Sequence, residues 1–330
     1  MIRSLPLLAS AAVLASLAAP VSAEEVDPGA IVALQFAVSG NHKGVRASGA
    51  KGVCLKGQFT PAADAASLSK APQFGKSDPA MPVPVTARFS MGGGNPKVSD
   101  KTKPTTRGFA MRMQDPAGDM TFVVISAPVF STRTPAQLLE FLQVRAPGPD
   151  GKPDPEKIKA FAAKNPETGR QAAWLNARPV PASFAGTDYW AVHTYTLTNA
   201  KGEATKARLK LVAADKATLS DDELKVKPDS FYADELKERL ARGPAKFDLV
   251  AILPEPGDPT TDATADLPEE RRTRTLGTLA ITGIEPDSTC DAATFDPVVD
   301  LPEGIAGPAD DPMFAIRSPA YAVSLSRRSN

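Results

Sequence analysis

The chain has few of the residues that most often carry chemistry, with two cysteines and two histidines among its 330 residues. Neither Cys54 nor Cys290 belongs to a C-x-x-C or C-x-x-C-H pattern. That absence disfavours dithiol redox chemistry, zinc knuckles and covalent c-type haem attachment. Two separated histidines, without a G-x-S-x-G motif, offer no evident catalytic triad. Gly92 to Asn95 lacks the Lys-Ser/Thr of a phosphate loop, so this glycine-rich stretch is typical of a tight connection.

The chain also lacks a net charge, because 38 Lys and Arg residues balance 38 Asp and Glu residues. Removal of one basic residue, Arg3, with a leader would leave 37 (38 minus 1) against 38. This balance gives no reason to expect nucleic acid or an anionic membrane as a partner.

The one long apolar run lies at the N-terminus, from Leu5 to Ala19. It follows Arg3 and precedes the small-x-small site Val21-Ser22-Ala23, which together predict a secretory signal peptide over residues 1–23. The run is shorter than the roughly 20 residues that a spanning helix needs. We therefore expect the mature chain, residues 24–330, to be secreted, into a bacterial periplasm, without a membrane anchor.

The pattern of the mature chain predicts strands, then helices, then strands again. Composition does not decide between one large domain and two smaller ones. Alternating or β-branched apolar runs separated by Gly, Pro and Asp clusters predict about eight strands. They cover Val53 to Phe59, Val83 to Met91, Arg107 to Met113, Thr121 to Ser126, Tyr189 to Thr198, Lys206 to Val212, Phe247 to Leu253 and Leu276 to Ile284. An eight-stranded antiparallel β-barrel needs pairings across the whole chain, so we predict a single α+β domain with peripheral helices.

Helix signals stand between the two groups of strands. Thr134-Pro135 and Asp154-Pro155 each combine an N-cap residue with proline at the first helical position. A third helix is predicted from Phe231 to Arg242, where Gly243-Pro244 ends it. Pro254 to Arg272 has no apolar periodicity and is predicted to be a surface loop.

Cys54 and Cys290 have two open interpretations. In an oxidising compartment they can form a disulfide, or they can remain two separate buried thiols. The choice depends on the distance between them, which the spacing in the sequence does not supply.

Arg317 precedes Tyr321 by one helical turn near the end of the chain. Residues four apart on a helix are neighbours, and a cation beside a phenol favours its ionised form. Tyrosine is one of the few side chains that hold haem iron. An isolated pair of this kind is more often simple packing, so its meaning depends on the rest of the sequence.

Several blocks of sequence supply that context. They are Arg46 to Gly52, Ala87 to Ser90, Thr106 to Met113, Ile125 to Phe130, Tyr189 to Tyr195, Phe295 to Pro297, Leu301 to Ile305 and Arg317 to Arg328. In order and spacing they resemble the haem catalase family over most of the mature chain. The length is similar to that of the small catalase-related peroxidases, which keep the barrel and helices but lack the terminal extensions of large catalases. The resemblance implies a minimal catalase-like fold.

The resemblance also implies a set of cofactor contacts. Tyr321 would be the proximal phenolate ligand of a haem b iron, with Arg317 holding it ionised. Phe130 would pack on the distal side. Arginines bind carboxylates in a bidentate, charge-assisted way, and three would face the haem propionates, namely Arg46, Arg88 and Arg328.

The distal side departs from the family pattern. The family reads Arg-x-x-His-Ala-x-Gly, whereas Gly49 stands at the histidine position here. In the family that histidine moves a proton between the two peroxide oxygens, which is general acid/base catalysis worth typically ~10²- to 10⁴-fold. Ser90 would sit where the family hydrogen-bonds its histidine, and Ser126 stands at the place of the distal asparagine of large catalases.

Three substitutes for the missing histidine can be considered. His42 lies seven residues before Gly49, so on a regular strand it points to the opposite face, unless a turn or bulge at Gly44 changes that. His193 lies in a tyrosine-rich strand and is best interpreted as a core histidine. The third substitute is water held by the nearby serines, Ser48, Ser90 or Ser126.

Together these features predict a haem peroxidase. The resemblance implies reduction of organic hydroperoxides or hydrogen peroxide with oxidation of a small-molecule electron donor, through an oxoferryl intermediate. The competing interpretation is a haem-binding protein on the same scaffold that is weakly catalytic or has lost catalysis, because Gly49 replaces the distal histidine.

Overall fold

The computed structural model describes residues 26–75 and 81–329. The predicted signal peptide, residues 1–23, lies outside the described residues. Nine antiparallel strands form one sheet. They are β1 (Gly52–Pro61), β2 (Val83–Met91), β3 (Arg107–Met113), β4 (Met120–Ile125), β5 (Tyr189–Thr198), β6 (Ala204–Ala213), β7 (Ala245–Ile252), β8 (Thr273–Ile284) and β9 (Ile305–Ala306).

The sheet closes into a barrel. Its order is β4-β3-β2-β1-β8-β7-β6-β5-β9, and a further pairing of Ile125 in β4 with Trp190 in β5 joins the two ends of the eight longer strands. The short β9 adds to β5 outside this closure. The predicted eight-stranded antiparallel barrel is therefore confirmed, with each predicted strand present within a few residues of its expected bounds.

Side chains fill the barrel. The ring of Phe89 lies 4.3 Å from that of Phe109 and 5.3 Å from that of Phe184, centroid to centroid. Phe109 also packs against Phe247 at 5.3 Å, and these rings are at most 2% exposed. Interior-facing residues of a small barrel form such a core. A ligand site must therefore lie outside this packed centre.

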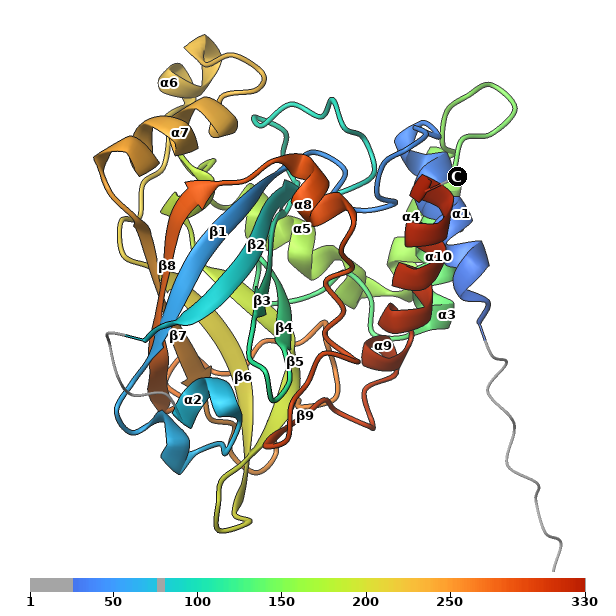
Figure 1. Ribbon diagram of the computed structural model, residues 1–330. Coiled ribbons are helices and arrows are strands. Elements are labelled where there is room, and N and C mark those ends of the chain that lie inside the picture. The colour runs from blue at the N-terminus through green and yellow to red at the C-terminus, as the bar shows by residue number, and fades with distance from the viewer. Residues whose placement is uncertain (1–25, 76–80, 330) are drawn as a thin grey trace, which may run out of the picture.

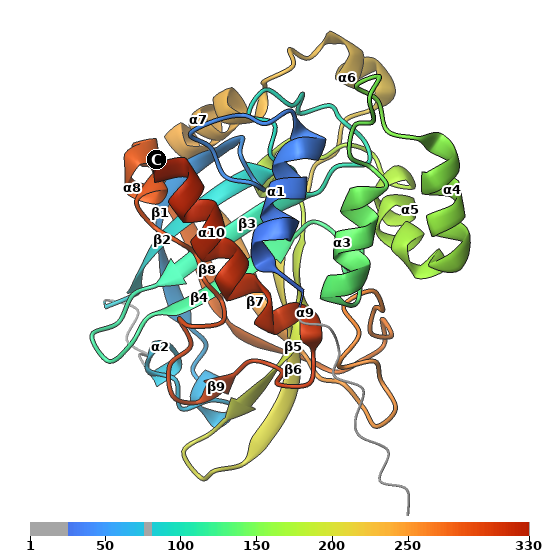
Figure 2. The ribbon, with the colours of Figure 1, turned by 90° about the vertical axis from the view of Figure 1, so that its right-hand side faces the viewer.

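One group of helices gathers on one side of the barrel (Figures 1 and 2), namely α1 (Pro28–Ser39), α3 (Pro135–Gln143), α4 (Pro155–Lys164), α9 (Pro312–Ala315) and α10 (Arg317–Ser329). The C-terminal helix α10 packs against α1, which also contacts α3. The remaining helices are α2 (Pro72–Gly75), α5 (Arg170–Asn176), α6 (Asp221–Val226), α7 (Tyr232–Arg242) and α8 (Asp287–Asp291). The helices predicted after Thr134 and Asp154 and over Phe231 to Arg242 are confirmed as α3, α4 and α7.

A disulfide joins Cys54 in β1 to Cys290 in α8, with the two Cα atoms 5.7 Å apart. This decides between the two interpretations that the sequence left open. Both cysteines are fully buried, and the bond connects positions 236 residues apart. The bond fastens α8, and with it the segment that leads toward α10, to the barrel strand β1.

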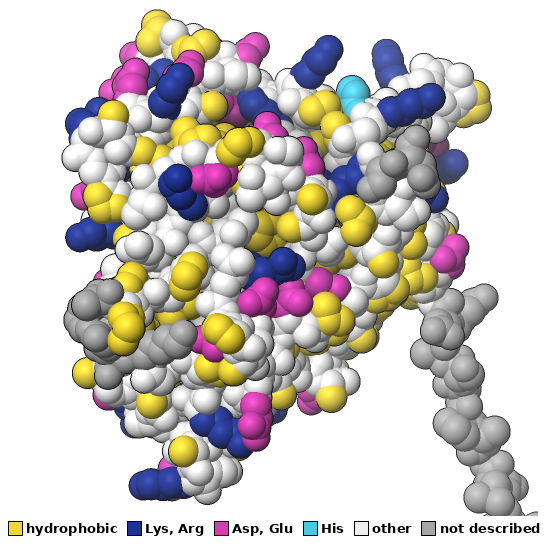
Figure 3. Space-filling view, viewed as in Figure 1, with side chains coloured by type: hydrophobic (Ala, Val, Ile, Leu, Met, Phe, Trp, Pro, Cys, Tyr) yellow, Lys and Arg dark blue, Asp and Glu magenta, His cyan; other side chains and the backbone are white. Residues whose placement is uncertain are grey.

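The described surface carries charges of both signs. On the face seen in Figure 3, basic and acidic side chains are interspersed, in line with the equal numbers of each in the chain. Within residues 26–75 and 81–329, no helix is long and apolar enough to cross a membrane.

Candidate active site

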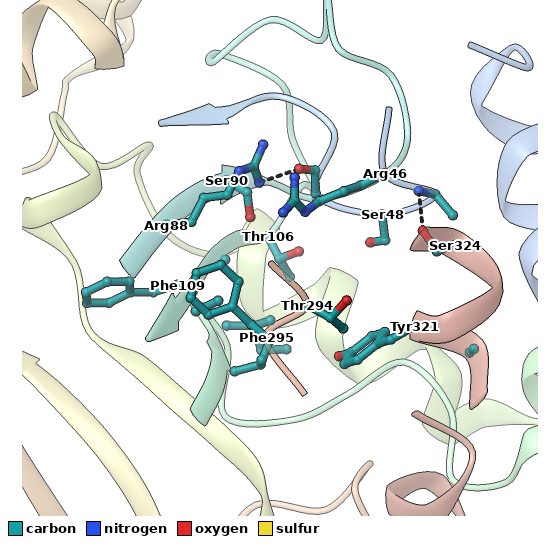
Figure 4. A pocket seen from close by; sticks show the side chains of 18 of the residues that line it. Arg46, Ser48, Arg88, Ser90, Thr106, Phe109, Thr294, Phe295, Tyr321 and Ser324 are labelled. Carbon is teal, nitrogen blue, oxygen red and sulfur yellow. Dashed lines mark hydrogen bonds between the residues drawn. The ribbon is translucent and has the colours of Figure 1, made fainter. Parts of the chain in front are cut away.

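A cavity lies between the barrel wall and α10 (Figure 4) and has a volume of about 210 Å³. The barrel strands β2, β3 and β4 supply one wall, and the loop before β1 closes one end. The opposite wall is α10, which contributes Tyr321, Ser324 and Arg328. Side chains three to four residues apart lie on one face of a helix, so this spacing turns all three toward the barrel.

The Arg317 and Tyr321 pair forms as the sequence predicts. Arg317 donates two hydrogen bonds to the phenol oxygen of Tyr321, from Nε at 3.1 Å and from Nη2 at 2.7 Å. Burial works against the charge of Arg317, but attraction to Tyr321 and to Tyr195 outweighs it and raises the pKa of Arg317 above its usual value. The two bonds fix the phenol oxygen of Tyr321 in place, and tyrosine is one of the few side chains that hold haem iron.

Three arginines meet at the other end of the cavity, and we call Arg46, Arg88 and Arg328 the arginine cradle. Arg88 in β2 donates to the carbonyl oxygens of Gly49 and Ala50, at 2.6 and 3.1 Å. Arg328 donates to a backbone carbonyl at 2.9 Å. Of the three, Arg46 alone pairs with a carboxylate, that of Asp291 at 2.7 Å.

The cradle holds more positive charge than its neighbours neutralise. Burial lowers the pKa of Arg88 to about 10, and the charge of Arg46 adds to the effect. The same two causes, in the same order, lower the pKa of Arg328 to about 10. A buried carboxylate or two at this end would relieve the repulsion.

The cavity fits haem. Its middle is lined by apolar side chains, among them Ala110, Val123 and Phe295. Two buried donors of residues that line the cavity, Nε of Arg328 and Oγ1 of Thr294, have no hydrogen-bond partner in the described structure. A flat apolar group with two carboxylates at one edge would satisfy both donors and cations. Within the described residues there is no cluster of three or more His, Cys, Asp or Glu that could hold a metal ion.

The distal wall has no acid/base group. Gly49 adopts a φ of +71°, and a Cβ there would come 3.1 Å from Oγ of Ser90. Within the part of the chain that the structure describes, the residues lining the cavity include no histidine, aspartate or glutamate. Besides Arg88, the polar side chains that the barrel side gives to the cavity are hydroxyls, and Figure 4 shows those of Ser90 and Thr106 near the loop that carries Ser48.

Neither histidine replaces the missing one. Gly44 does make a turn, with φ of +70°, but residues 40–50 form no strand, and the His42 ring lies against Gly40 instead of lining the cavity. His193 is buried, with Nδ1 2.7 Å from Oδ2 of Asp311. It is the core histidine that its strand context indicated.

Two of the predicted distal residues lie elsewhere. Phe130 packs against the cluster of Ile31, Leu138 and Met313 between the helices, and it does not line the cavity. The chain turns toward α3 after β4, so Phe130 lies among these helices, and its packing on the distal side of a haem stays a prediction. Oγ of Ser126 accepts a hydrogen bond from the backbone N–H of Arg107 at 2.9 Å, so this hydroxyl closes the strand pair instead of facing the cavity.

Other lining residues were not predicted. Gln35 comes from α1, a helix without a motif of its own, and Thr294 comes from the segment after α8. Thr106 and Ser324 lie inside the sequence blocks that carried the family resemblance. That position was the only feature of the sequence that could have indicated them as lining residues. Oγ of Ser324 accepts a bond from the backbone N–H of Ala47 at 3.2 Å and joins α10 to the loop of the cradle.

The geometry defines a class of protein: a closed antiparallel barrel with a cofactor cavity between its outer wall and a C-terminal helix that carries an arginine-held tyrosine. Comparisons with known proteins agree. The Catalase family model matches residues 43–328. A catalase-related peroxidase of Synechococcus elongatus is 34% identical over 313 residues, covering 93% of this chain and 90% of the relative. A catalase-related peroxidase of Mycolicibacterium paratuberculosis is 33% identical, with 88% and 91% covered.

The chain belongs to the catalase family. A crystal structure of a fungal catalase superposes with a TM-score of 0.75 at 21% identity, covering 86% of this chain and 59% of the fungal chain. That likeness bears on the fold alone. The family match spans all three arginines of the cradle as well as Arg317 and Tyr321.

Proposed function

We propose that this chain is a haem-dependent peroxidase that reduces organic hydroperoxides or hydrogen peroxide and oxidises a small-molecule donor. Its family and relatives make it an oxidoreductase that acts on peroxide. The observation that supports a haem-dependent peroxidase is the double hydrogen bond from Arg317 to the phenol oxygen of Tyr321 at the cavity. We further propose that the mature chain acts after export to a periplasm.

The cofactor we propose is haem b, held without covalent attachment. Both cysteines are bonded to each other, so neither offers a thiol for a thioether link. Tyr321 would hold the iron as a phenolate, and the arginine cradle would bind the propionates. When bound, the haem supplies the two-electron chemistry: it is oxidised by the peroxide and reduced by the donor.

On the distal side, this chain's own residues can orient the peroxide but cannot act as a strong base. The Ser90 hydroxyl makes no hydrogen bond with another described residue and borders the cavity beside Gly49. It can donate to a bound peroxide or hold a water that passes a proton. A hydroxyl releases one proton only as it takes up another, so we expect modest turnover compared with an imidazole.

A specific observation favours a second candidate, a haem-binding protein with little or no catalysis. The described residues that line the cavity include no histidine or carboxylate. Loss of the distal base leaves a pocket that still binds haem, because the tyrosine and the cradle are complete.

A peroxidase assay separates the two. The mature protein is loaded with haem and mixed with cumene hydroperoxide or hydrogen peroxide and a hydrogen-donor dye. We expect a rate per haem well above that of free haem, and a large loss in Tyr321→Phe. A stable haem complex whose rate matches free haem would support the haem-binding protein instead. No complex at all would contradict both.

A further inference from the structure

We propose that the disulfide between Cys54 and Cys290 is a positioning element for the cofactor: it holds the segment from Cys290 to Phe295, which sets the arginine cradle in place. This inference rests on the haem site proposed above. It assigns the bond a role in binding the propionates in addition to any general stabilisation.

The segment binds two of the three arginines mainly through its backbone. Arg46 donates from Nη2 to the carbonyl oxygen of Cys290 at 2.6 Å and to that of Ala293 at 3.3 Å. Its Nη1 pairs with Asp291 at 2.7 Å. Arg328 donates to the same Ala293 oxygen at 2.9 Å. Two guanidinium groups from opposite ends of the chain are thus oriented by carbonyls within four residues.

The same bond aligns the segment with the third arginine. In the ladder between β1 and β2, Cys54 lies directly opposite Arg88. The Sγ atom of Cys290 also lies 3.3 Å from the carbonyl oxygen of Ala87, the neighbour of Arg88. The disulfide therefore joins the segment that orients the other two arginines to β1, the strand paired with the one that carries Arg88.

The segment also presents a donor of its own. Thr294 lines the cavity, and its buried Oγ1 has no hydrogen-bond partner in the described structure. The carbonyl of Thr294 is fixed by Arg112 at 2.6 Å, which leaves the hydroxyl as the group free to meet a ligand. A hydroxyl can donate a hydrogen bond to a carboxylate oxygen. The segment therefore contributes to the cavity both through the carbonyls that hold two arginines and through the Thr294 hydroxyl.

The start of this segment overlaps α8, a helix of five residues whose N-cap makes no side-chain hydrogen bond, and Asp291 is 56% exposed. Besides the disulfide, a backbone bond from Glu285 to Cys54 at 2.9 Å and the packing of Phe295 with the two cysteines hold it to the barrel. Three like charges repel one another, so the cradle needs acceptors in fixed positions. Because both cysteines are fully buried, the bond acts as a permanent fastening.

The test measures haem affinity with and without the propionate charge. The double variant Cys54→Ala/Cys290→Ala and the unaltered protein are titrated with haem and with haem dimethyl ester, and the Soret band is followed. We expect the variant to bind haem at least ~10-fold more weakly, since one lost charge-assisted hydrogen bond is worth about that much. Binding of the ester, which has no carboxylates, should change about 2-fold or less.

Two further variants control for general destabilisation. Leu236→Ala empties a fully buried position in α7, away from the cradle, and should leave the ratio of the two affinities unchanged. Asp291→Ala removes an exposed partner of Arg46 and cannot prevent folding by opening the core, so it tests the segment even if the double variant does not fold. It should weaken haem binding and spare the ester.

The outcomes are distinguishable. If the unaltered protein binds neither porphyrin, the proposed function fails and this inference with it. If it binds haem but the double variant loses both porphyrins equally, the disulfide only stabilises the fold. If neither affinity changes, the segment keeps its place without the bond. The last two results overturn this inference and leave the proposed function standing.

Discussion

Restoring an imidazole at position 49 should restore peroxide cleavage. Gly49 stands where the family has its distal histidine, and in this chain no described residue lining the cavity is a histidine or a carboxylate. The substitution Gly49→His places a general base on the loop that closes one end of the cavity, beside Ser90. A positioned base contributes typically ~10²- to 10⁴-fold to such a step. We expect at least ~10-fold, because the ring must settle beside the Ser90 hydroxyl.

The structure also sets the cost of this change. At φ of +71° a side chain costs about 1–2 kcal/mol, and histidine tolerates this region better than most residues. The new Cβ would lie 3.1 Å from Oγ of Ser90, so the Ser90 side chain must move by a few tenths of an ångström. We therefore expect a melting temperature a few degrees lower, at about 2–4 °C per kcal/mol for large domains. The fold should survive.

The matched control is Gly49→Ala, which has the same backbone strain and Cβ without the imidazole. Initial rates of peroxide cleavage are compared for the haem-loaded proteins across pH 5 to 8. The gain in the histidine variant should grow as pH rises through about 6.5, where imidazole loses its proton. A folded, haem-loaded Gly49→His protein that is no faster than Gly49→Ala would refute the reasoning.

Three smaller changes test other contacts. Arg317→Met removes two charge-assisted bonds to the proximal phenol, each worth about 1.5–3 kcal/mol, and should shift the ferric haem spectrum and weaken haem binding. Gly52→Ala puts a Cβ directly against the backbone carbonyl oxygen of Phe89 and 2.7 Å from Cζ of Arg88, so β1 must shift against β2, and chemical denaturation should show a loss of about 1–3 kcal/mol or more together with a lower haem affinity. Burial lowers the pKa of His193, and its bond to Asp311 only partly opposes this, so the unfolded chain takes up this proton first. Stability should fall as pH drops below about 6.5, and His193→Asn should flatten that slope in denaturation curves between pH 7.5 and 5; an unchanged slope would contradict this assignment.

Much of the barrel could be predicted because its strands carry local signals. Runs such as Val83 to Met91 alternate or are β-branched, and turn residues separate them. Each strand could therefore be predicted without knowing which strands it pairs with. Thr134 and Asp154 likewise marked helix starts through their own side chains, which accept bonds from the first turn. Barrel closure through Ile125 and Trp190 is a long-range pairing that only the count of strands suggested.

The site could be predicted where local geometry alone brings two residues together. Arg317 and Tyr321 meet because helix geometry brings residues four apart together, so spacing alone placed them. Phe130 could not be placed this way, since its direction depends on how the chain leaves β4 to reach α3. The disulfide and the role of the segment after Cys290 depend on contacts across more than 200 residues, which local patterns do not contain.

The most direct test of the central claim is a Soret titration of the purified mature protein with haem, repeated on Tyr321→Phe. The account predicts one haem per chain, with a ferric spectrum of tyrosinate ligation that is lost in the variant, which keeps the ring of the tyrosine without its oxygen. A protein that develops no haem band, or a Tyr321→Phe variant whose spectrum and affinity equal those of the unaltered chain, would contradict it.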